Sequence, residues 1–186
     1  IINAGDGSHE HPTQALLDMM SLKEKFGKLK GLKIAIIGDI SHSRVALSNI
    51  IGLCKMGVKV TLCGPSHLIP LGIEELGVEV NYDINEVIEW ADAINVLRIQ
   101  RERMGIGVIP SIREYRRHFG ITKERIALYD KEIVIMHPGP MNRGVEIDSA
   151  IADSGQAIIL NQVLNGVAVR MSILYLLLAS DDEESK

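Results

Sequence analysis

Cysteines and long apolar runs are both scarce in this chain of 186 residues, and each shortage excludes a class of protein. The only cysteines are Cys54 and Cys63, and both lie inside apolar stretches. Their number and separation match neither a zinc site nor the dense disulfide scaffold of a small secreted protein. We therefore expect a protein of a reducing compartment, the cytoplasm, with no metal centre.

The longest apolar run extends from Val167 to Ala179 and is interrupted by Arg170 and Ser172. It is shorter than the roughly 18 to 20 residues that a membrane span requires. We expect it to form a buried helix and predict no membrane association. The acidic run 181–184 that follows is expected to be a solvated chain end.

A strong excess of one charge is also lacking. Twenty Lys and Arg residues against 24 Asp and Glu residues give a formal net charge of −4. No broad electrostatic field therefore favours nucleic acid, and we expect no nucleic-acid partner. The hydrophobic content of 46% is enough to fill the core of one domain of ordinary size.

Short apolar runs rich in β-branched residues alternate with helical patterns along most of the chain. This alternation is typical of βαβ units. It predicts an α/β fold, a doubly wound (Rossmann-like) parallel five-stranded sheet with helices on both faces. The five strands are expected at Lys33–Gly38, Val58–Cys63, Val78–Asn81, Ala93–Leu97 and Glu132–Met136.

Helical patterns with identifiable start and stop residues lie between these runs. Pro12 suits the first turn of a leading helix, and Gly27 would end it. The last helical stretch is expected to break into two near Asn165-Gly166. The remaining expected helices are Pro12–Phe26, Ser43–Met56, Glu86–Trp90, Ser111–His118 and Thr122–Tyr129.

Polar residues that could bind a ligand follow the first expected strand. A dinucleotide-binding turn would need several spaced glycines here, but only Gly38 is present, and the second strand ends on Gly64-Pro65 instead of an acidic residue. A dinucleotide-dependent oxidoreductase is therefore disfavoured. Ser43 can instead cap the following helix. The free N–H groups at the start of that helix, together with Arg44, would form an anion site.

A second arginine follows the fourth expected strand. Strand alternation places Arg98 and Gln100 on the same side. The usual strand order puts the first and fourth strands side by side where the winding reverses, so both side chains should face the crevice of Arg44. Two guanidinium groups at one crevice suit a small molecule with two carboxylates.

Two further motifs are expected at this crevice. Prolines rigidify the turn His137-Pro138-Gly139-Pro140, whose carbonyl groups could accept hydrogen bonds from a substrate amine. A Pro-Gly-Pro turn alone is more often a plain loop, and a lone histidine at a helix start is more often a cap. His11 and Gln14 nevertheless share one helix face beside free N–H groups, which suits an anionic or carbonyl-bearing ligand.

In combination, these residues closely resemble the catalytic chain of the aspartate carbamoyltransferase family, within the aspartate/ornithine carbamoyltransferase superfamily. The matching motifs occur in the family's order and spacing across nearly the whole chain. A Cys-Leu-Pro turn and a Ser-Met-Gly loop, typical of ornithine carbamoyltransferases, are not found. The matching motifs are Asn3-Ala4-Gly5-Asp6-Gly7, His11-Pro12-Thr13-Gln14, Ser43-Arg44-Val45, Arg98 to Arg103 and His137-Pro138-Gly139-Pro140.

The resemblance implies transfer of a carbamoyl group from carbamoyl phosphate to L-aspartate, without a metal or organic cofactor. It implies that His11 is catalytic and polarises the carbamoyl oxygen, and that His11, Gln14, Gly139 and Pro140 bind carbamoyl phosphate. Arg44, Arg98 and Gln100 would hold the aspartate carboxylates. It also implies a homotrimer, with regulatory chains or dihydroorotase as further candidate partners.

The family's first domain, with its Ser-x-Arg-Thr-Arg phosphate loop, has no counterpart in these 186 residues. The resemblance therefore predicts that residues 1–165 form the aspartate-binding domain, in which residues 1–27 lead in from the carbamoyl-phosphate domain. Residues 166–186 would form a terminal helix that packs on that first domain. The alternative function is a non-catalytic, carbamoyltransferase-like assembly domain, which the intact His11, Arg44, Arg98 and Gln100 disfavour.

Overall fold

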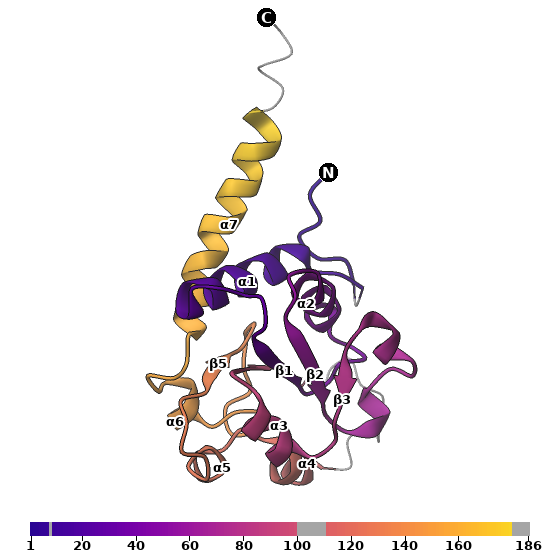
Figure 1. Ribbon diagram of the computed structural model, residues 1–186, viewed down its shortest axis with the longest axis vertical. Coiled ribbons are helices and arrows are strands. Elements are labelled where there is room, and N and C mark those ends of the chain that lie inside the picture. Colours follow the sequence, from indigo (N-terminus) through magenta and orange to yellow (C-terminus); the bar gives the residue numbers. More distant parts are fainter. Residues whose placement is uncertain (8, 100–110, 180–186) are drawn as a thin grey trace, which may run out of the picture.

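A computed structural model describes residues 1–7, 9–99 and 111–179 of the chain. Its centre is a parallel five-stranded sheet in the order β3-β2-β1-β4-β5 (Figure 1). The predicted doubly wound α/β fold is therefore confirmed, including the pairing of β1 with β4 at the reversal point. The strands are β1 (Lys33–Ile37), β2 (Lys59–Cys63), β3 (Glu79–Val80), β4 (Ala93–Val96) and β5 (Val134–Met136).

Two hydrophobic clusters, one on each face of the sheet, form the core. In β1, Ile34 and Ile36 belong to one cluster, and Ala35 and Ile37 belong to the other, as the alternation of a strand requires. The first cluster includes residues of α1 and α2, and the second includes residues of α3, α5 and α6. Helices therefore cover both faces, as predicted.

The helices largely follow the predicted boundaries, within a few residues. Pro12 starts α1, Gly27 ends it in the left-handed conformation, and the Ser43 hydroxyl caps α2 by accepting a hydrogen bond from the Ala46 N–H. The helices are α1 (Pro12–Phe26), α2 (Arg44–Lys55), α3 (Ile84–Trp90), α4 (Ile112–Phe119), α5 (Lys123–Ile126), α6 (Ser149–Ala152) and α7 (Ile159–Ala179), with short 3₁₀ turns at Ser66–Leu68 and Ile73–Leu76.

The predicted break near Asn165-Gly166 is wrong, because α7 runs through both residues without interruption. Asn165 is buried and donates hydrogen bonds to the Ser21 hydroxyl and the Glu24 carboxylate of α1. A Cβ atom on Gly166 would lie 3.2 Å from Leu17 Cδ2. The two residues that suggested a helix end therefore let α7 pack closely against α1.

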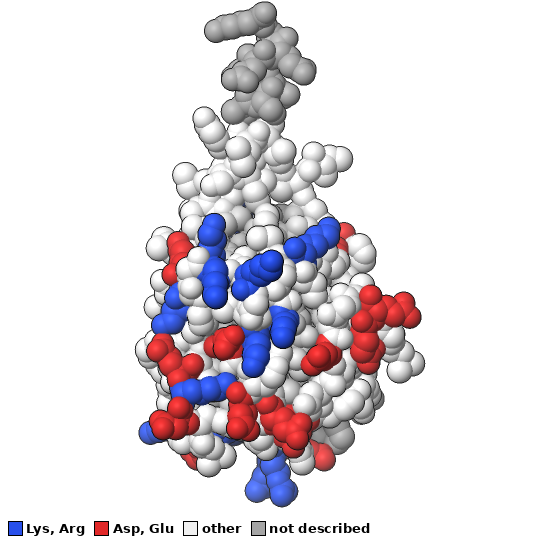
Figure 2. Space-filling model, viewed as in Figure 1, with Lys and Arg blue, Asp and Glu red and all other residues white. Residues whose placement is uncertain are grey.

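The second half of α7, for which cover by the first domain is expected, projects from the body of this chain (Figure 1). Leu174, Tyr175, Leu176 and Leu178 are all exposed. Figure 2 shows this projection as a white surface above a body of mixed charge. By length and composition, α7 is the one candidate for a membrane span within the described ranges, which is weak evidence because core helices of soluble proteins pass the same test.

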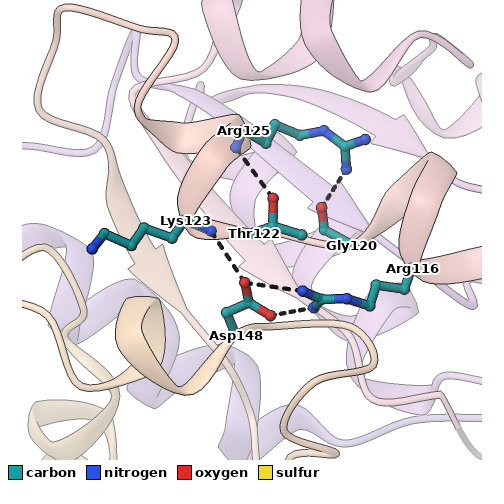
Figure 3. A network of polar contacts seen from close by, with 6 residues as sticks. All are labelled: Arg116, Gly120, Thr122, Lys123, Arg125 and Asp148. Atoms are coloured by element: carbon teal, nitrogen blue, oxygen red, sulfur yellow. Dashed lines mark hydrogen bonds and ion pairs between the residues drawn. The ribbon is translucent and has the colours of Figure 1, made fainter. Parts of the chain in front are cut away.

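A polar network connects α4, α5 and the residue before α6 (Figure 3). The Asp148 carboxylate accepts hydrogen bonds from the Arg116 guanidinium and from the Lys123 N–H. The hydrogen bond from Arg116 is the main reason why the pKa of Asp148 lies below its usual value. Arg125 donates to the carbonyl oxygen of Gly120, so this network fixes the turn between α4 and α5.

Candidate active site

One cavity of about 190 Å³ lies at the carboxyl ends of the central strands, between the starts of α1 and α2. Parallel sheets of this type bind ligands there, beyond the point where the winding reverses. The volume is below the roughly 300 Å³ at which drug-sized pockets begin, so the cavity fits a small metabolite. Its lining residues are His11, Gln14, Ser43, Arg44, Val45, Arg98, Pro138, Gly139 and Pro140.

The cavity brings together nearly every residue that the sequence predicted for a site. His11 and Gln14 come from the start of α1, Arg44 from the start of α2, and Arg98 from the segment after β4. Gly139 and Pro140 of the predicted set line it as well, from the loop after β5. The remaining predicted residue, Gln100, lies outside the described residues.

Two guanidinium groups line this small space. Arg44 and Arg98 are both half-buried. The segment before α1 packs against Arg44, since a Cβ atom on Gly5 would lie 2.7 Å from its Nη1. Gly5 also has φ +131°, so this close approach requires glycine. Two partly desolvated cations bind a small dianion better than two fully solvated ones would.

His11 is held at the start of α1 by its backbone. Its N–H donates to the Ser48 hydroxyl at 2.8 Å, and Ser48 donates in turn to the Glu10 carboxylate. Burial lowers the pKa of the His11 imidazole, and Arg44 and Arg170 lower it further. The ring is therefore neutral at pH 7, and a neutral imidazole can donate a hydrogen bond to a carbonyl oxygen.

Buried side chains support the loop after β5 on the side that faces the protein interior. The Gly139 N–H donates to His137 Nδ1 at 2.9 Å, and the His137 N–H donates to Gln162 Oε1 at 3.0 Å. His137 Nε2 lies 3.4 Å from a carboxylate oxygen of Glu146, and both side chains are fully buried. The sequence placed this turn at the site but did not reveal its supporting residues, because Glu146 and Gln162 contact it only in the folded chain.

A second buried group missed by the sequence reasoning is the Asp18 carboxylate of α1. It accepts hydrogen bonds from the side-chain amides of four residues on four elements. The only local signal was its position one helical turn after Gln14 on the same helix face. The four donors are Gln14, Asn49, Asn95 and Gln162.

Metal ligation has no candidate in the part of the chain that the structure describes, where no three His, Cys, Asp or Glu side chains converge. Cys63 is the buried last residue of β2, and burial raises the pKa of its thiol to about 12. Such a thiol stays protonated at neutral pH and is a poor nucleophile. The groups that the cavity presents are therefore cations, amides, one imidazole and backbone atoms.

A comparison with protein families decides how this arrangement is classified. Residues 30–177 match the aspartate/ornithine carbamoyltransferase family over its Asp/Orn binding domain. The chain belongs to this family. The matched region includes all five strands, so the resemblance that the motifs indicated is confirmed over the whole sheet.

Individual relatives agree with the family match. An aspartate carbamoyltransferase catalytic subunit from Cytophaga hutchinsonii is 61% identical over 177 residues, which cover 95% of this chain and 58% of that protein. Among solved structures, the catalytic subunit of M. jannaschii aspartate transcarbamoylase has a TM-score of 0.81 at 34% identity, covering 100% of this chain and 61% of that one.

A ligand-bound structure is similar to the same degree. Aspartate transcarbamoylase from Trypanosoma cruzi in complex with N-(phosphonacetyl)-L-aspartic acid has a TM-score of 0.81 at 30% identity, covering 93% of this chain and 57% of that one. The chain therefore spans about three-fifths of the length of these relatives.

Proposed function

We propose that the polypeptide containing this chain transfers the carbamoyl group of carbamoyl phosphate to L-aspartate. The products are N-carbamoyl-L-aspartate and phosphate, as in pyrimidine synthesis. The observation that carries the proposal is the joint presence of Arg44 and Arg98 in a cavity that His11 and Gln14 also line. Two arginines match the two carboxylates of aspartate, whereas ornithine carries one carboxylate and a second amine.

Each group has a role in a direct displacement. The aspartate amine attacks the carbamoyl carbon, a tetrahedral intermediate forms, and the C–O bond to phosphate breaks while the amine loses a proton. Neutral His11 donates to the oxygen on which negative charge develops. Arg44, Arg98 and Gln100 hold the carboxylates, and Gln14, Gly139 and Pro140 bind the carbamoyl side, so that the two substrates are oriented together.

The remaining parts of the reaction are assigned to residues beyond this chain. Among the described residues that line the cavity, the only cations are the two arginines assigned to aspartate. We therefore assign phosphate binding to the part of the relatives' length that this chain does not cover. A cytoplasmic homotrimer, alone or with regulatory chains or dihydroorotase, is the assembly proposed.

The test is a transfer assay with ¹³C-carbamoyl phosphate on the full-length polypeptide. Carbamoyl-aspartate should form, and L-ornithine should be a poor acceptor. The 186-residue chain alone should have negligible activity, because the missing stabilisation of phosphate and oxyanion is worth about 3 kcal/mol or more. A full-length polypeptide that carbamoylates ornithine, or neither amino acid, would contradict the proposal.

A further inference from the structure

The Asp18 carboxylate is completely buried and lies among amide groups. Its Oδ1 accepts from Gln14 Nε2 at 3.0 Å and from Gln162 Nε2 at 2.7 Å. Its Oδ2 accepts from Asn49 Nδ2 at 2.7 Å and more weakly from Asn95 Nδ2 at 3.4 Å. Asp18 thus joins α1, α2, β4 and α7 immediately behind the cavity.

An ionised carboxylate accepts hydrogen bonds and donates none. Each amide that faces Asp18 must therefore turn its NH₂ group toward it and its carbonyl oxygen away. Gln14 also lines the cavity, and no donor among the described residues contacts its Oε1. The Gln14 Oε1 atom is therefore accessible and not an unpaired buried atom, and it can accept a hydrogen bond from a ligand in the cavity.

The same rule fixes the opposite wall of the cavity. Because Gln162 gives its NH₂ group to Asp18, its carbonyl oxygen is free to accept the His137 N–H, which it does at 3.0 Å. His137 begins the loop whose Pro138, Gly139 and Pro140 line the cavity. One carboxylate oxygen therefore sets the orientation of two glutamines on two sides of the site.

We propose that Asp18 is a positioning residue that makes the cavity selective for an amide end of the ligand. Held by Asp18, Gln14 presents its carbonyl oxygen, which accepts an N–H and has nothing to bind on a methyl group. The inference rests on the proposed function and adds the residue that sets the direction of recognition. Burial raises the pKa of Asp18 to about 6. At neutral pH the carboxylate is therefore ionised, and it accepts hydrogen bonds without donating any.

Two ligands of equal charge test the inference in the full-length polypeptide. Phosphonoacetamide carries an NH₂ group where 2-oxopropylphosphonate carries a methyl group. Calorimetry should show wild-type protein preferring the amide about tenfold, since one acceptor is otherwise left unpaired. Asp18→Ala removes both acceptor oxygens, so nothing holds the NH₂ group of Gln14 toward the interior, and the preference should fall below about threefold.

Two further variants separate positioning from general loss of structure. Asn49→Ala removes a donor from the other carboxylate oxygen and should lower the melting temperature but keep the tenfold preference. Gln14→Leu should abolish the preference, and adding Asp18→Ala to it should change the ratio no further. If Asp18→Ala does not fold, a preference that survives Gln14→Leu still overturns the inference.

The outcomes distinguish this inference from the proposed function. A wild-type polypeptide that forms carbamoyl-aspartate, with a preference that survives Asp18→Ala or Gln14→Leu, overturns the role of Asp18 alone. That role is also overturned if Asp18→Ala still changes the ratio in the Gln14→Leu background. A wild-type polypeptide that binds neither ligand overturns the proposed function, and the inference with it.

Discussion

Arg44 and Arg98 are 54 positions apart in sequence, and only the pairing of β1 with β4 brings them to one cavity. Neither arginine is distinctive alone, because a surface arginine after a strand is common. Their meaning comes from the parallel sheet, in which the carboxyl ends of neighbouring strands share an edge. The chemistry of the site is therefore a property of single side chains placed by long-range pairing.

Replacing Arg98 by alanine should weaken aspartate use selectively in the full-length polypeptide. A lost charge-assisted contact costs about 2 to 3 kcal/mol, which lowers kcat/KM for aspartate roughly 30- to 150-fold. Arg143→Ala is the control, since Arg143 is exposed and pairs with Asp153 away from the cavity. Equal losses in the two variants on steady-state kinetics would contradict the role of Arg98.

Asp18 should leave a signature in the pH dependence of stability. Its pKa is raised from 3.8 to about 6 in the folded chain, so the folded state binds a proton that the unfolded state has released. This group therefore stabilises the fold as the pH falls from about 6 to about 4, and the contribution is lost as the pH rises through 6. The difference is on the order of 3 kcal/mol.

Urea denaturation of the wild-type chain and of Asp18→Asn between pH 4 and pH 8 measures this difference. Relative to the variant, the wild-type chain should lose stability as the pH rises. Curves that stay parallel would mean that Asp18 titrates at the same pH in both states, and that its burial does not matter for ionisation.

The sequence was informative about the residues that line the cavity and silent about the residues that support them. Arg44, His11 and Gln14 stand at helix starts, where local rules assign a meaning to a polar side chain. Asp18 and Glu146 obtain their partners from elements far away in sequence. No periodicity or spacing encodes such a partner, so these supports became visible only in the fold.

The packing of α1 against α7 brings Gln162 of α7 to the Asp18 carboxylate of α1. Gly166 permits their close approach, and Asn165 bonds back to α1 across the same contact. A glycine inside a helical pattern predicted a break because glycine lowers helix propensity. The tertiary contact overrides that preference, which explains why the sequence reasoning failed at this point although it succeeded for the caps of α1 and α2.

Gly166→Leu should therefore destabilise the chain by about 1 to 3 kcal/mol, because the added side chain meets Leu17 and must push α7 away from α1. Ala168→Leu on the exposed side of α7 serves as the matched control and should be neutral or slightly stabilising. Chemical denaturation measures both variants. If Gly166→Leu is as stable as the control, the helices do not need the glycine to pack.

At the scale of the whole molecule, the second half of α7 stands away from the body with its leucines exposed (Figure 1). A contiguous apolar surface of this kind usually contacts another protein surface. About two-fifths of the length of the relatives lies outside the part that this chain covers. The 186-residue chain studied alone therefore has an apolar helix face without cover from its own described residues.

The isolated chain should associate through this face. Sedimentation velocity should detect oligomers that dissociate when Leu174 and Leu178, one helical turn apart, are both changed to glutamate. The double variant Lys28→Gln and Lys30→Gln, outside α7, is the control, because it lowers the net charge by the same two units. A chain that is monomeric before and after the changes in α7 would contradict this expectation.

In the proposed complex, aspartate lies between Arg44 and Arg98 while the transferred group faces His11 and Gln14. A crystal structure of the full-length polypeptide with N-(phosphonacetyl)-L-aspartic acid tests it most directly. Both carboxylates of the aspartyl part should lie within hydrogen-bonding distance of the Arg44 and Arg98 guanidinium groups, and the acetyl oxygen should lie near the His11 ring. Carboxylates bound away from both arginines, or a ligand outside this cavity, would contradict it.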